Sequence, residues 1–215
     1  MPTEIGPILA RHRTIGEGTE IGALCDIAEG VEIGRDCTIK SVCVILEGCK
    51  IGDRTRISHH VVIEENCTIG DDSFIGNGCV LRPNTKIGNN VVIGHLCVFE
   101  GDTTIGDGTL IHAQCHITAG VKIGRKVFIA PLFCGANDPR MSHARRHIIP
   151  FERKGYVIED YARIAIGVLL NPGITVGKNS LIRMGAVVTR DVPENAIVQG
   201  VPASLLGEVP EEERL

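Results

Sequence analysis

Isoleucine recurs at every sixth position over more than half of the chain. From Ile15 to Ile129 this period defines 20 positions, of which 18 are Ile and the other two are Leu81 and Phe99. Two residues before each position stands Cys, Thr, Val or Ser, with Arg13 as the exception, and Gly, Asn or Asp often follows three residues after it. A period of six fits neither a helix nor an alternating strand. It predicts very short strands that point Ile inward and are joined by tight, partly left-handed turns.

Three such units of six residues can close one triangular coil. Coils of this kind stack with their backbones hydrogen-bonded at a strand spacing of about 4.8 Å. The period therefore predicts an all-β parallel solenoid of roughly eight coils.

The repeat is interrupted once. It stops near residue 132 and resumes in a shifted frame with Ile164, Leu170, Val176, Ile182 and Val188. We therefore divide the chain into a β-helix over residues 1–131, an inserted substrate loop over 132–161, final coils over 162–192 and a cap over 193–215. We expect the stretch ASLLGEV at 203–209 to be helical. A loop of about 30 residues inside a compact domain is usually functional or disordered.

Eight of the nine cysteines occupy the small position two residues before an inward aliphatic residue. A free cysteine packs as a small hydrophobic residue. These eight are therefore predicted to fill the core, and they need neither a disulfide nor a metal. Cys134 alone lies outside the frame.

The charge and the termini limit the possible partners. The net charge is −4 and no long run of one sign occurs, which argues against a nucleic-acid-binding surface. The N-terminal stretch has no apolar core of a signal peptide, and no apolar stretch approaches the roughly 18 residues of a membrane span. The sequence thus predicts a cytoplasmic protein with no nucleic-acid partner and no membrane contact.

The repeat resembles the hexapeptide-repeat family, whose unit is an aliphatic residue, often Gly, two free positions, a small residue and one more. The resemblance implies a left-handed parallel β-helix. It also implies a homotrimer, with substrates bound between neighbouring subunits.

The segment from Asn171 to Val209 contains "NPGITVGKNSLIRMGAVVTRDVP" and "GVPA". It is similar to the C-terminal signature of hexapeptide acyltransferases, where it forms part of the coenzyme A site. The resemblance implies acetyl-CoA as co-substrate and four contact positions: Ala165, Arg183, Gly185 and Arg190. The family often has Gly where Ala165 and Arg183 stand.

The acceptor is suggested by a second resemblance. Nucleotide-sugar N-acetyltransferases carry a Gln-Asn-Asn run before a "TND…PR" loop. This chain has Gln114, Cys115 and His116, followed by the loop 137–140, Asn-Asp-Pro-Arg. The resemblance implies acetylation of an amino sugar on a nucleotide carrier. Another small amine or hydroxyl, such as an amino-acid precursor, is the alternative acceptor.

The expected reaction is a direct attack of the amine on the thioester. A histidine suits the task of accepting the proton of the amine, and we expect His116 to do so. Asp138 would bind the ammonium form and orient the sugar. Four more residues are expected to contact the acceptor: Gln114, Asn137, Arg140 and His143.

Each assignment has a structural alternative. His116 can be one solvated histidine of eight, Asn-Asp-Pro is an ordinary turn sequence, and Glu47 and Glu100 are expected to face solvent. A γ-carbonic-anhydrase-like zinc site would use His95, His112 and His116, although their spacing differs from that family. A non-catalytic scaffold is the third possibility. We expect no metal.

Overall fold

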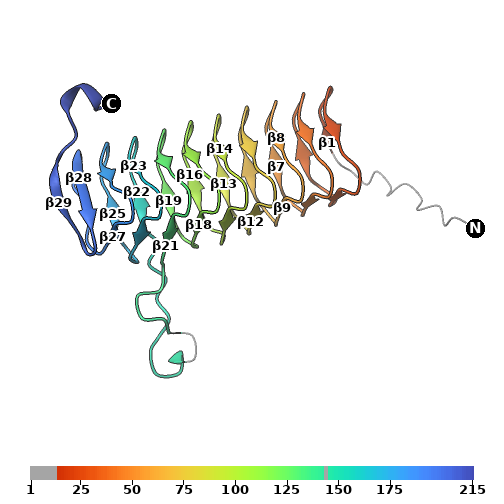
Figure 1. Cartoon of the computed structure of the whole chain (residues 1–215). Coiled ribbons are helices and arrows are strands. Elements are labelled where there is room, and N and C mark those ends of the chain that lie inside the picture. Colours follow the sequence, from red (N-terminus) through yellow and green to blue (C-terminus); the bar gives the residue numbers. More distant parts are fainter. Residues whose placement is uncertain (1–13, 143–144) are drawn as a thin grey trace, which may run out of the picture.

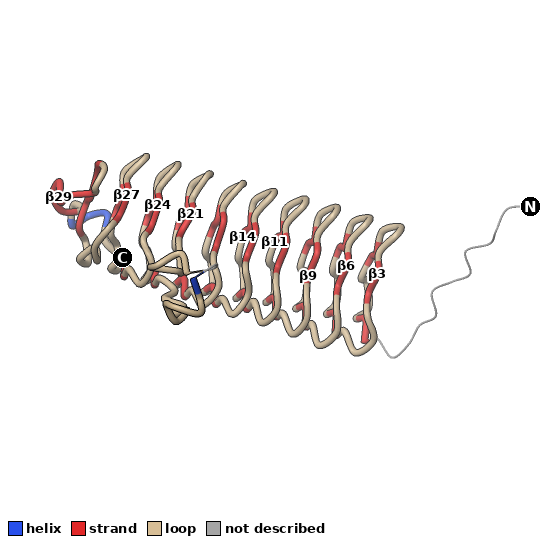
Figure 2. The backbone as a smooth tube through the Cα atoms, turned by 90° about the horizontal axis from the view of Figure 1, so that it is seen from below, coloured by secondary structure: helices blue, strands red, loops and turns tan. Residues whose placement is uncertain are grey.

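The chain folds into a three-sided parallel β-solenoid, described here from a computed structural model over residues 14–142 and 145–215. Figure 1 shows coils stacked along one axis, with β1 and the C-terminal hairpin at opposite ends of the stack and one loop projecting from its side. Figure 2 shows that each strand is a short segment between corners. Within these residues no helix is long and apolar enough to span a bilayer. The solenoid predicted from the period of six is confirmed.

The first face, sheet A, has nine parallel strands. They are β1 (Thr14–Ile15), β4 (Glu32–Ile33), β7 (Lys50–Ile51), β10 (Thr68–Ile69), β13 (Lys86–Ile87), β16 (Thr104–Ile105), β19 (Lys122–Ile123), β22 (Val157–Ile158) and β25 (Thr175–Val176).

The second face, sheet B, has eleven strands, of which the last pair is antiparallel. They are β2 (Glu20–Ile21), β5 (Thr38–Ile39), β8 (Arg56–Ile57), β11 (Phe74–Ile75), β14 (Val92–Ile93), β17 (Leu110–Ile111), β20 (Phe128–Ile129), β23 (Arg163–Ile164), β26 (Leu181–Ile182), β28 (Ala196–Gly200) and β29 (Ala203–Glu208).

The third face, sheet C, again has nine parallel strands, so the solenoid is longer than the roughly eight coils predicted. They are β3 (Asp26–Ile27), β6 (Val44–Ile45), β9 (Val62–Ile63), β12 (Val80–Leu81), β15 (Val98–Phe99), β18 (His116–Ile117), β21 (Cys134–Gly135), β24 (Leu169–Leu170) and β27 (Val187–Val188).

The small positions form a second set of interactions between coils. Seven of the eight in-frame cysteines are buried, and Cys25, in the first coil, is half-buried. Most donate to a carbonyl 15 residues later, as in Cys43 Sγ to Ser58 O (3.0 Å), and Thr55 Oγ1 does the same to Gly70 O (2.8 Å). Burial raises the pKa of the Cys37 and Cys43 thiols, which keeps them protonated donors. The predicted core role is confirmed.

The corner between sheets A and B is held by a ladder of carboxylate and amide oxygens. Asp53 Oδ1 accepts the Arg35 N–H (2.8 Å), Asp71 Oδ1 accepts the Asp53 N–H (2.9 Å), and Asn89 Oδ1 accepts the Asp71 N–H (2.8 Å). Each oxygen satisfies a turn N–H that no strand pairs. This explains why Asp and Asn follow Ile-Gly so often in the repeat.

The projecting loop is shorter than the 132–161 segment predicted as an insertion. Strands β21 and β22 lie inside that range, so the chain leaves the coils after Gly135 and returns at Tyr156. Gly135 stands where other coils have an aliphatic residue, and Tyr156 fills the space from a small position. A Cβ at Gly135 would clash with the Tyr156 ring. The two exceptions compensate each other, which hid this coil from the sequence pattern.

The C-terminal cap is a β-hairpin, and the helix predicted over 203–209 is wrong. Strand β28 continues sheet B beyond β26, and β29 pairs antiparallel with β28. The last coil otherwise ends in unpaired main-chain groups, and a strand satisfies them where a helix cannot. The 3-10 turn η2 (Glu211–Glu213) follows, and Arg163 binds Glu213 (2.6 Å).

The mutual compensation of Gly135 and Tyr156 can be tested by replacing them with residues that are typical of the repeat. We expect Gly135→Ile and Tyr156→Val each to lower the free energy of unfolding, by about 2 kcal/mol or more from overpacking and cavity formation respectively. The double variant should lose less than the sum of the two. Denaturant unfolding measures all three. Additive losses would contradict the compensation.

Candidate active site

His116 is the centre of the candidate site. It is the first residue of β18 and points outward from sheet C, in register with Val98 on the preceding coil and Cys134 on the next. Its Nε2 lies 3.1 Å from Glu100 Oε1, and the two side chains are 42% and 33% exposed. The sequence analysis placed Glu100 in solvent. Glu100 stands 16 residues before His116, which is two residues less than one coil. This spacing could have indicated the contact from the sequence, and it was missed.

Gln114 lies beside His116 in sequence but at a corner. It has a left-handed backbone (φ 60°), is exposed, and donates its N–H to His95 O (2.9 Å). The residues stacked on it are Leu96, Leu132, Gly167 and Gly185. This series forms the edge between sheets B and C, which we call the B–C edge.

Three of the predicted coenzyme residues lie along or beside this edge. Ala165 and Arg183 stack on successive coils, because Ala165 N–H bonds Ile182 O (2.9 Å). Gly185 has φ +66° and open space around its missing Cβ. Strand β27, which follows Gly185, is three coils from β18 in sheet C, or roughly 14 Å at the usual strand spacing. A long, extended ligand can reach from these residues to His116.

Arg190 follows β27 and lines a separate pocket of about 260 Å³ between the last coil and the C-terminal hairpin. Val192, Val198 and Leu205 form its apolar wall. Asp191 also lines it, but its Oδ1 is engaged by the Thr175 N–H (2.8 Å). Arg190 is thus the only predicted coenzyme residue among those lining this pocket.

The loop residues make contacts within the chain. Asn137 Nδ2 donates to Ala119 O (3.0 Å), and Asn137 O accepts the Lys154 N–H (2.8 Å), which ties together the two ends of the loop. Asp138 accepts from the Arg140 N–H (3.0 Å) and from the Ser142 N–H (2.9 Å) and hydroxyl (3.2 Å). These bonds, the backbone ones first, lower the pKa of Asp138. They fit the turn-forming alternative, and a substrate role for either residue stays a prediction.

Arg140 is exposed on the same loop. His143, also predicted to contact the acceptor, lies outside the described residues.

The three histidines of the zinc alternative are not brought together. His95 Nδ1 accepts the Asn77 N–H (2.8 Å), His112 packs edge-on against Phe128 (5.3 Å between ring centroids), and His116 meets Glu100. Over residues 14–142 and 145–215, no group of three His, Cys, Asp or Glu side chains is placed to hold a metal ion.

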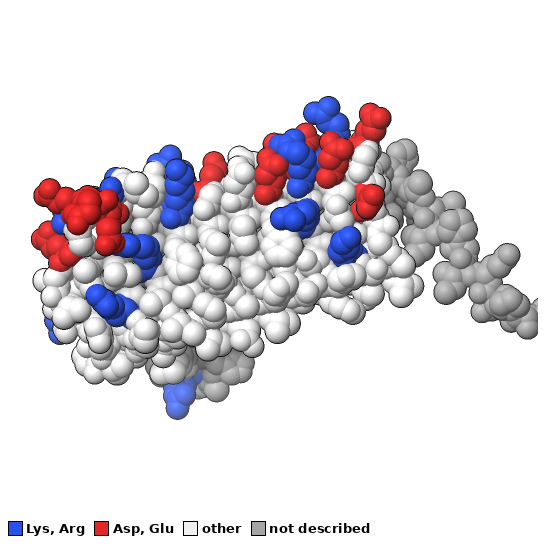
Figure 3. All heavy atoms as spheres, turned by 45° about the horizontal axis from the view of Figure 1, so that its top comes forward, with Lys and Arg blue, Asp and Glu red and all other residues white. Residues whose placement is uncertain are grey.

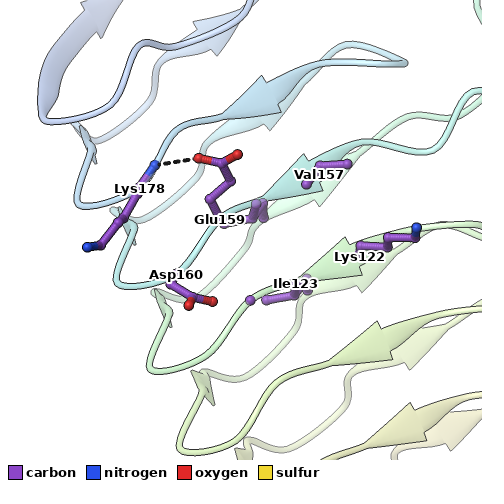
Figure 4. A pocket seen from close by; sticks show the side chains of 8 residues that line it. Lys122, Ile123, Val157, Glu159, Asp160 and Lys178 are labelled. Atoms are coloured by element: carbon purple, nitrogen blue, oxygen red, sulfur yellow. Dashed lines mark hydrogen bonds between the residues drawn. The ribbon is translucent and has the colours of Figure 1, made fainter.

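A pocket of about 360 Å³ lies at the corner between sheets A and B, away from the His116 face. Figure 4 shows its lining, with Lys122 and Lys178 pointing away from each other. Glu159 Oε2 accepts the Lys178 N–H (2.9 Å), and Asp160 binds Arg125 (2.7 Å). Its carboxylates therefore serve the corner ladder, and the predicted site residues lie elsewhere.

Two family models match the chain. The model of the bacterial transferase hexapeptide (six repeats) matches residues 66–101 and 102–131. The model of the hexapeptide repeat of succinyl-transferase matches residues 14–47 and 162–190. Together the matches cover more than half of the chain.

Curated relatives match over shorter stretches. Galactoside O-acetyltransferase of Escherichia coli is 33% identical over 90 residues, which are 41% of this chain and 44% of that protein. The 2,3,4,5-tetrahydropyridine-2,6-dicarboxylate N-acetyltransferase of Staphylococcus aureus is 38% identical over 55 residues, or 26% of this chain and 23% of that protein. The chain therefore spans less than half the length of these relatives.

Solved structures resemble most of the solenoid. A UDP-N-acetylglucosamine acyltransferase of Arabidopsis aligns with a TM-score of 0.75 at 23% identity, covering 92% of this chain and 70% of that one, and this shows the fold alone. A hexapeptide-repeat acetyltransferase of Vibrio cholerae, complexed with acetyl coenzyme A, aligns with a TM-score of 0.51 at 27% identity, covering 66% and 71%.

Removing the Asp138 carboxylate tests whether it organises the loop. We expect Asp138→Ala to speed trypsin cleavage after Arg140, Arg145 or Arg146, because two N–H groups lose their acceptor. Asp138→Asn keeps one acceptor oxygen and should be cut at an intermediate rate. Equal cleavage rates in all three proteins would contradict the organising role.

The same contact has a pH dependence. A carboxyl group whose folded pKa is depressed stabilises the folded state above its unfolded value, about 3.9, and this contribution is lost as the pH falls through the lower folded pKa. The amide resonances of Arg140 and Ser142 should therefore keep their neutral-pH positions down to about pH 4.

Proposed function

Because the chain belongs to the hexapeptide-repeat family, we propose that it is an acyl-CoA-dependent acyltransferase. More narrowly, we propose an acetyl-CoA-dependent N-acetyltransferase of the cytoplasm that acts on a nucleotide-linked amino sugar. The carrying observation is a partly exposed histidine, His116, paired with Glu100 and lying on the line of coils that leads to the coenzyme signature. The acetyl coenzyme A complex of the Vibrio cholerae relative supports the choice of donor.

The reaction needs one proton acceptor and a place for the thioester. The neutral amine attacks the thioester carbon, the C–S bond breaks, and the proton of the amine passes through His116 to the departing thiolate of coenzyme A. The small Ala165 and the open Gly185 leave room for the pantetheine arm. Arg190 is the proposed contact of a coenzyme phosphate, and Arg183, exposed beside the arm, is a second cation.

The loop is the proposed source of acceptor choice. Arg140, Arg145 and Arg146 are exposed on it, and guanidinium groups bind a diphosphate bidentately. Arg146 also lies over the Phe151 ring (4.9 Å), which restricts its position. The two curated relatives are named for a hydroxyl and for an amine acceptor, so a small amine or hydroxyl without a nucleotide is the second candidate.

A homotrimer is proposed from the strained B–C edge. Leu24, Val42, Leu96 and Leu132 have left-handed backbones there (φ 59°, 64°, 59° and 64°) and are 39–79% exposed. Left-handed backbone costs a side chain about 1–2 kcal/mol, and the equivalent residues at the other two edges are mostly Gly, Asn or Asp. Figure 3 shows charged side chains mostly along the upper margin of the visible face and at its C-terminal end, above a broad area with few charges. A partner that covers a straight edge of this length must match the spacing between its coils. Another copy of the chain has that spacing.

Acetyl transfer is tested directly with purified protein, acetyl-CoA and a panel of nucleotide-linked amino sugars, with product detected by mass spectrometry. His116→Ala should lower kcat/KM by about 100-fold or more, while its thermal shift with coenzyme A persists. Cys134→Ala is the matched control on the next coil. Burial, then the charge of Glu100, raises the pKa of the Cys134 thiol, so it is a poor nucleophile and its loss should cost little.

Three results would decide against parts of this proposal. No thermal shift with coenzyme A points to a scaffold. Full activity of His116→Ala removes the proposed base. Acetylation of simple amines or galactosides in preference to nucleotide sugars selects the second acceptor class.

The assembly is tested with Leu96→Asn and Leu132→Asn combined. Asn tolerates left-handed backbone, so each subunit should be no less stable, while the oligomer should dissociate in analytical ultracentrifugation. Asn90→Asp, at the same turn position of another edge (φ 55°), is the control and should leave the assembly unchanged. A double variant that stays fully assembled would contradict the role of the edge.

A further inference from the structure

We infer that Glu100 is a positioning residue that fixes the tautomer of His116 and makes Nδ1, not Nε2, the atom that accepts the proton of the substrate. This inference rests on the proposed acyl transfer for its chemistry. Its structural part, the tautomer, stands apart from any activity.

The two side chains are held by rigid backbone on adjacent coils. Glu100 directly follows β15, and its N–H bonds Ile117 O (2.9 Å). His116 N–H bonds Phe133 O (2.9 Å). Each residue is therefore fixed by the ladder that builds sheet C, and the 3.1 Å contact between Nε2 and Oε1 follows from the register.

The side chains around the pair do not compete with His116 for the Glu100 carboxylate. Val98 and Cys134 flank His116 along the sheet and carry no cationic group. Arg82, one coil before Glu100, is directed to Glu64 (3.7 Å). Among the residues that the structure describes, Glu100 pairs with His116.

The chemistry of the pair then follows. An ionised carboxylate only accepts hydrogen bonds, so the ring nitrogen that meets it must carry a hydrogen. A neutral imidazole with Nε2–H keeps its lone pair on Nδ1. When Nδ1 takes a proton, the positive charge forms beside the Glu100 carboxylate, which favours it by Coulomb attraction.

This assignment also orients the substrate. The two nitrogens open toward opposite edges of the ring, and Glu100 lies on the preceding coil. We therefore expect Nδ1 to open on the side away from Glu100, and the later coils that carry Ala165 and Gly185 lie beyond β21 in the order of the sheet. The acceptor amine and the thioester are expected to meet on that side.

A purely stabilising role is a poor account of the contact. Exposed ion pairs contribute little to folding, and both side chains are partly exposed. Glu100→Gln should consequently keep the melting temperature of the wild type. Its amide can donate to Nε2, which permits the Nδ1–H tautomer and blocks the base.

The test combines kinetics with the tautomer itself. Glu100→Gln should lower kcat by about 10- to 100-fold, part of the 10²- to 10⁴-fold that a positioned base supplies, with KM for acetyl-CoA within about twofold. Glu100→Asp, which keeps the carboxylate, should recover part of the loss. Glu64→Gln is the matched control: it removes an outward carboxylate at the same strand position, two coils earlier, and should change neither quantity.

The ring nitrogens are read by ¹⁵N NMR of histidine-labelled protein. We expect Nε2–H in the wild type and a shift toward Nδ1–H in Glu100→Gln. An Nδ1–H wild type, or a Glu100→Gln protein with wild-type kcat, would overturn the assignment. If the Nε2–H tautomer depends on Glu100 but no acyl acceptor is acetylated, then the positioning role holds and the proposed function fails.

Discussion

The hydrogen bonding of each coil to the next is the constraint on which the whole molecule depends. A two-residue strand cannot stand alone, and each one here is stabilised by its neighbours 18 residues away, as in the pairing of Ile33 with Ile51. Two side-chain ladders also join each coil to the next: the corner oxygens, such as Asp53 on Arg35 N–H, 18 residues apart, and the core donors, such as Cys43 on Ser58 O, 15 residues apart. Because backbone, corners and core share one pitch, a change of register in one would break the other two.

That rigidity gives the candidate site its geometry. His116 and Glu100 are 16 residues apart, yet their contact requires no loop to close and no helix to pack. The coil stack also sets the order along sheet C, with the histidine in the middle and the coenzyme signature on later coils. The projecting loop, unlike the coils, is not fixed by the stacking. Its ends are joined through Asn137 and Lys154, so its interior can vary without disturbing the stack.

The repeat could be predicted from the sequence because one residue type fills one role in almost every coil. The cysteines were placed correctly by their frame alone. The coil that begins with Gly135 was missed because two deviations cancel only in space, and neither Gly135 nor Tyr156 fits the pattern by itself. Strand β29 was missed because the sequence ASLLGEV suits either state, and the open edge of the last coil decides between them. Glu100 was missed because outward carboxylates recur along sheet C, and in the sequence only its spacing of 16 residues from His116 sets it apart.

Some residues at the B–C edge are not explained by the fold of a single subunit. At the other edges the left-handed turn positions carry mostly Gly, Asn and Asp, as the backbone favours. At this edge four of these positions carry Leu or Val, which suit neither that backbone nor exposure to water. Their side chains are 39–79% exposed, so the core of one solenoid does not bury them. The residues that look wrong for the monomer lie along the edge that also bears Gln114 and Gly185, beside His116. The exposed Leu and Val residues are therefore best explained by a surface that a neighbouring copy would cover, next to the face that bears His116.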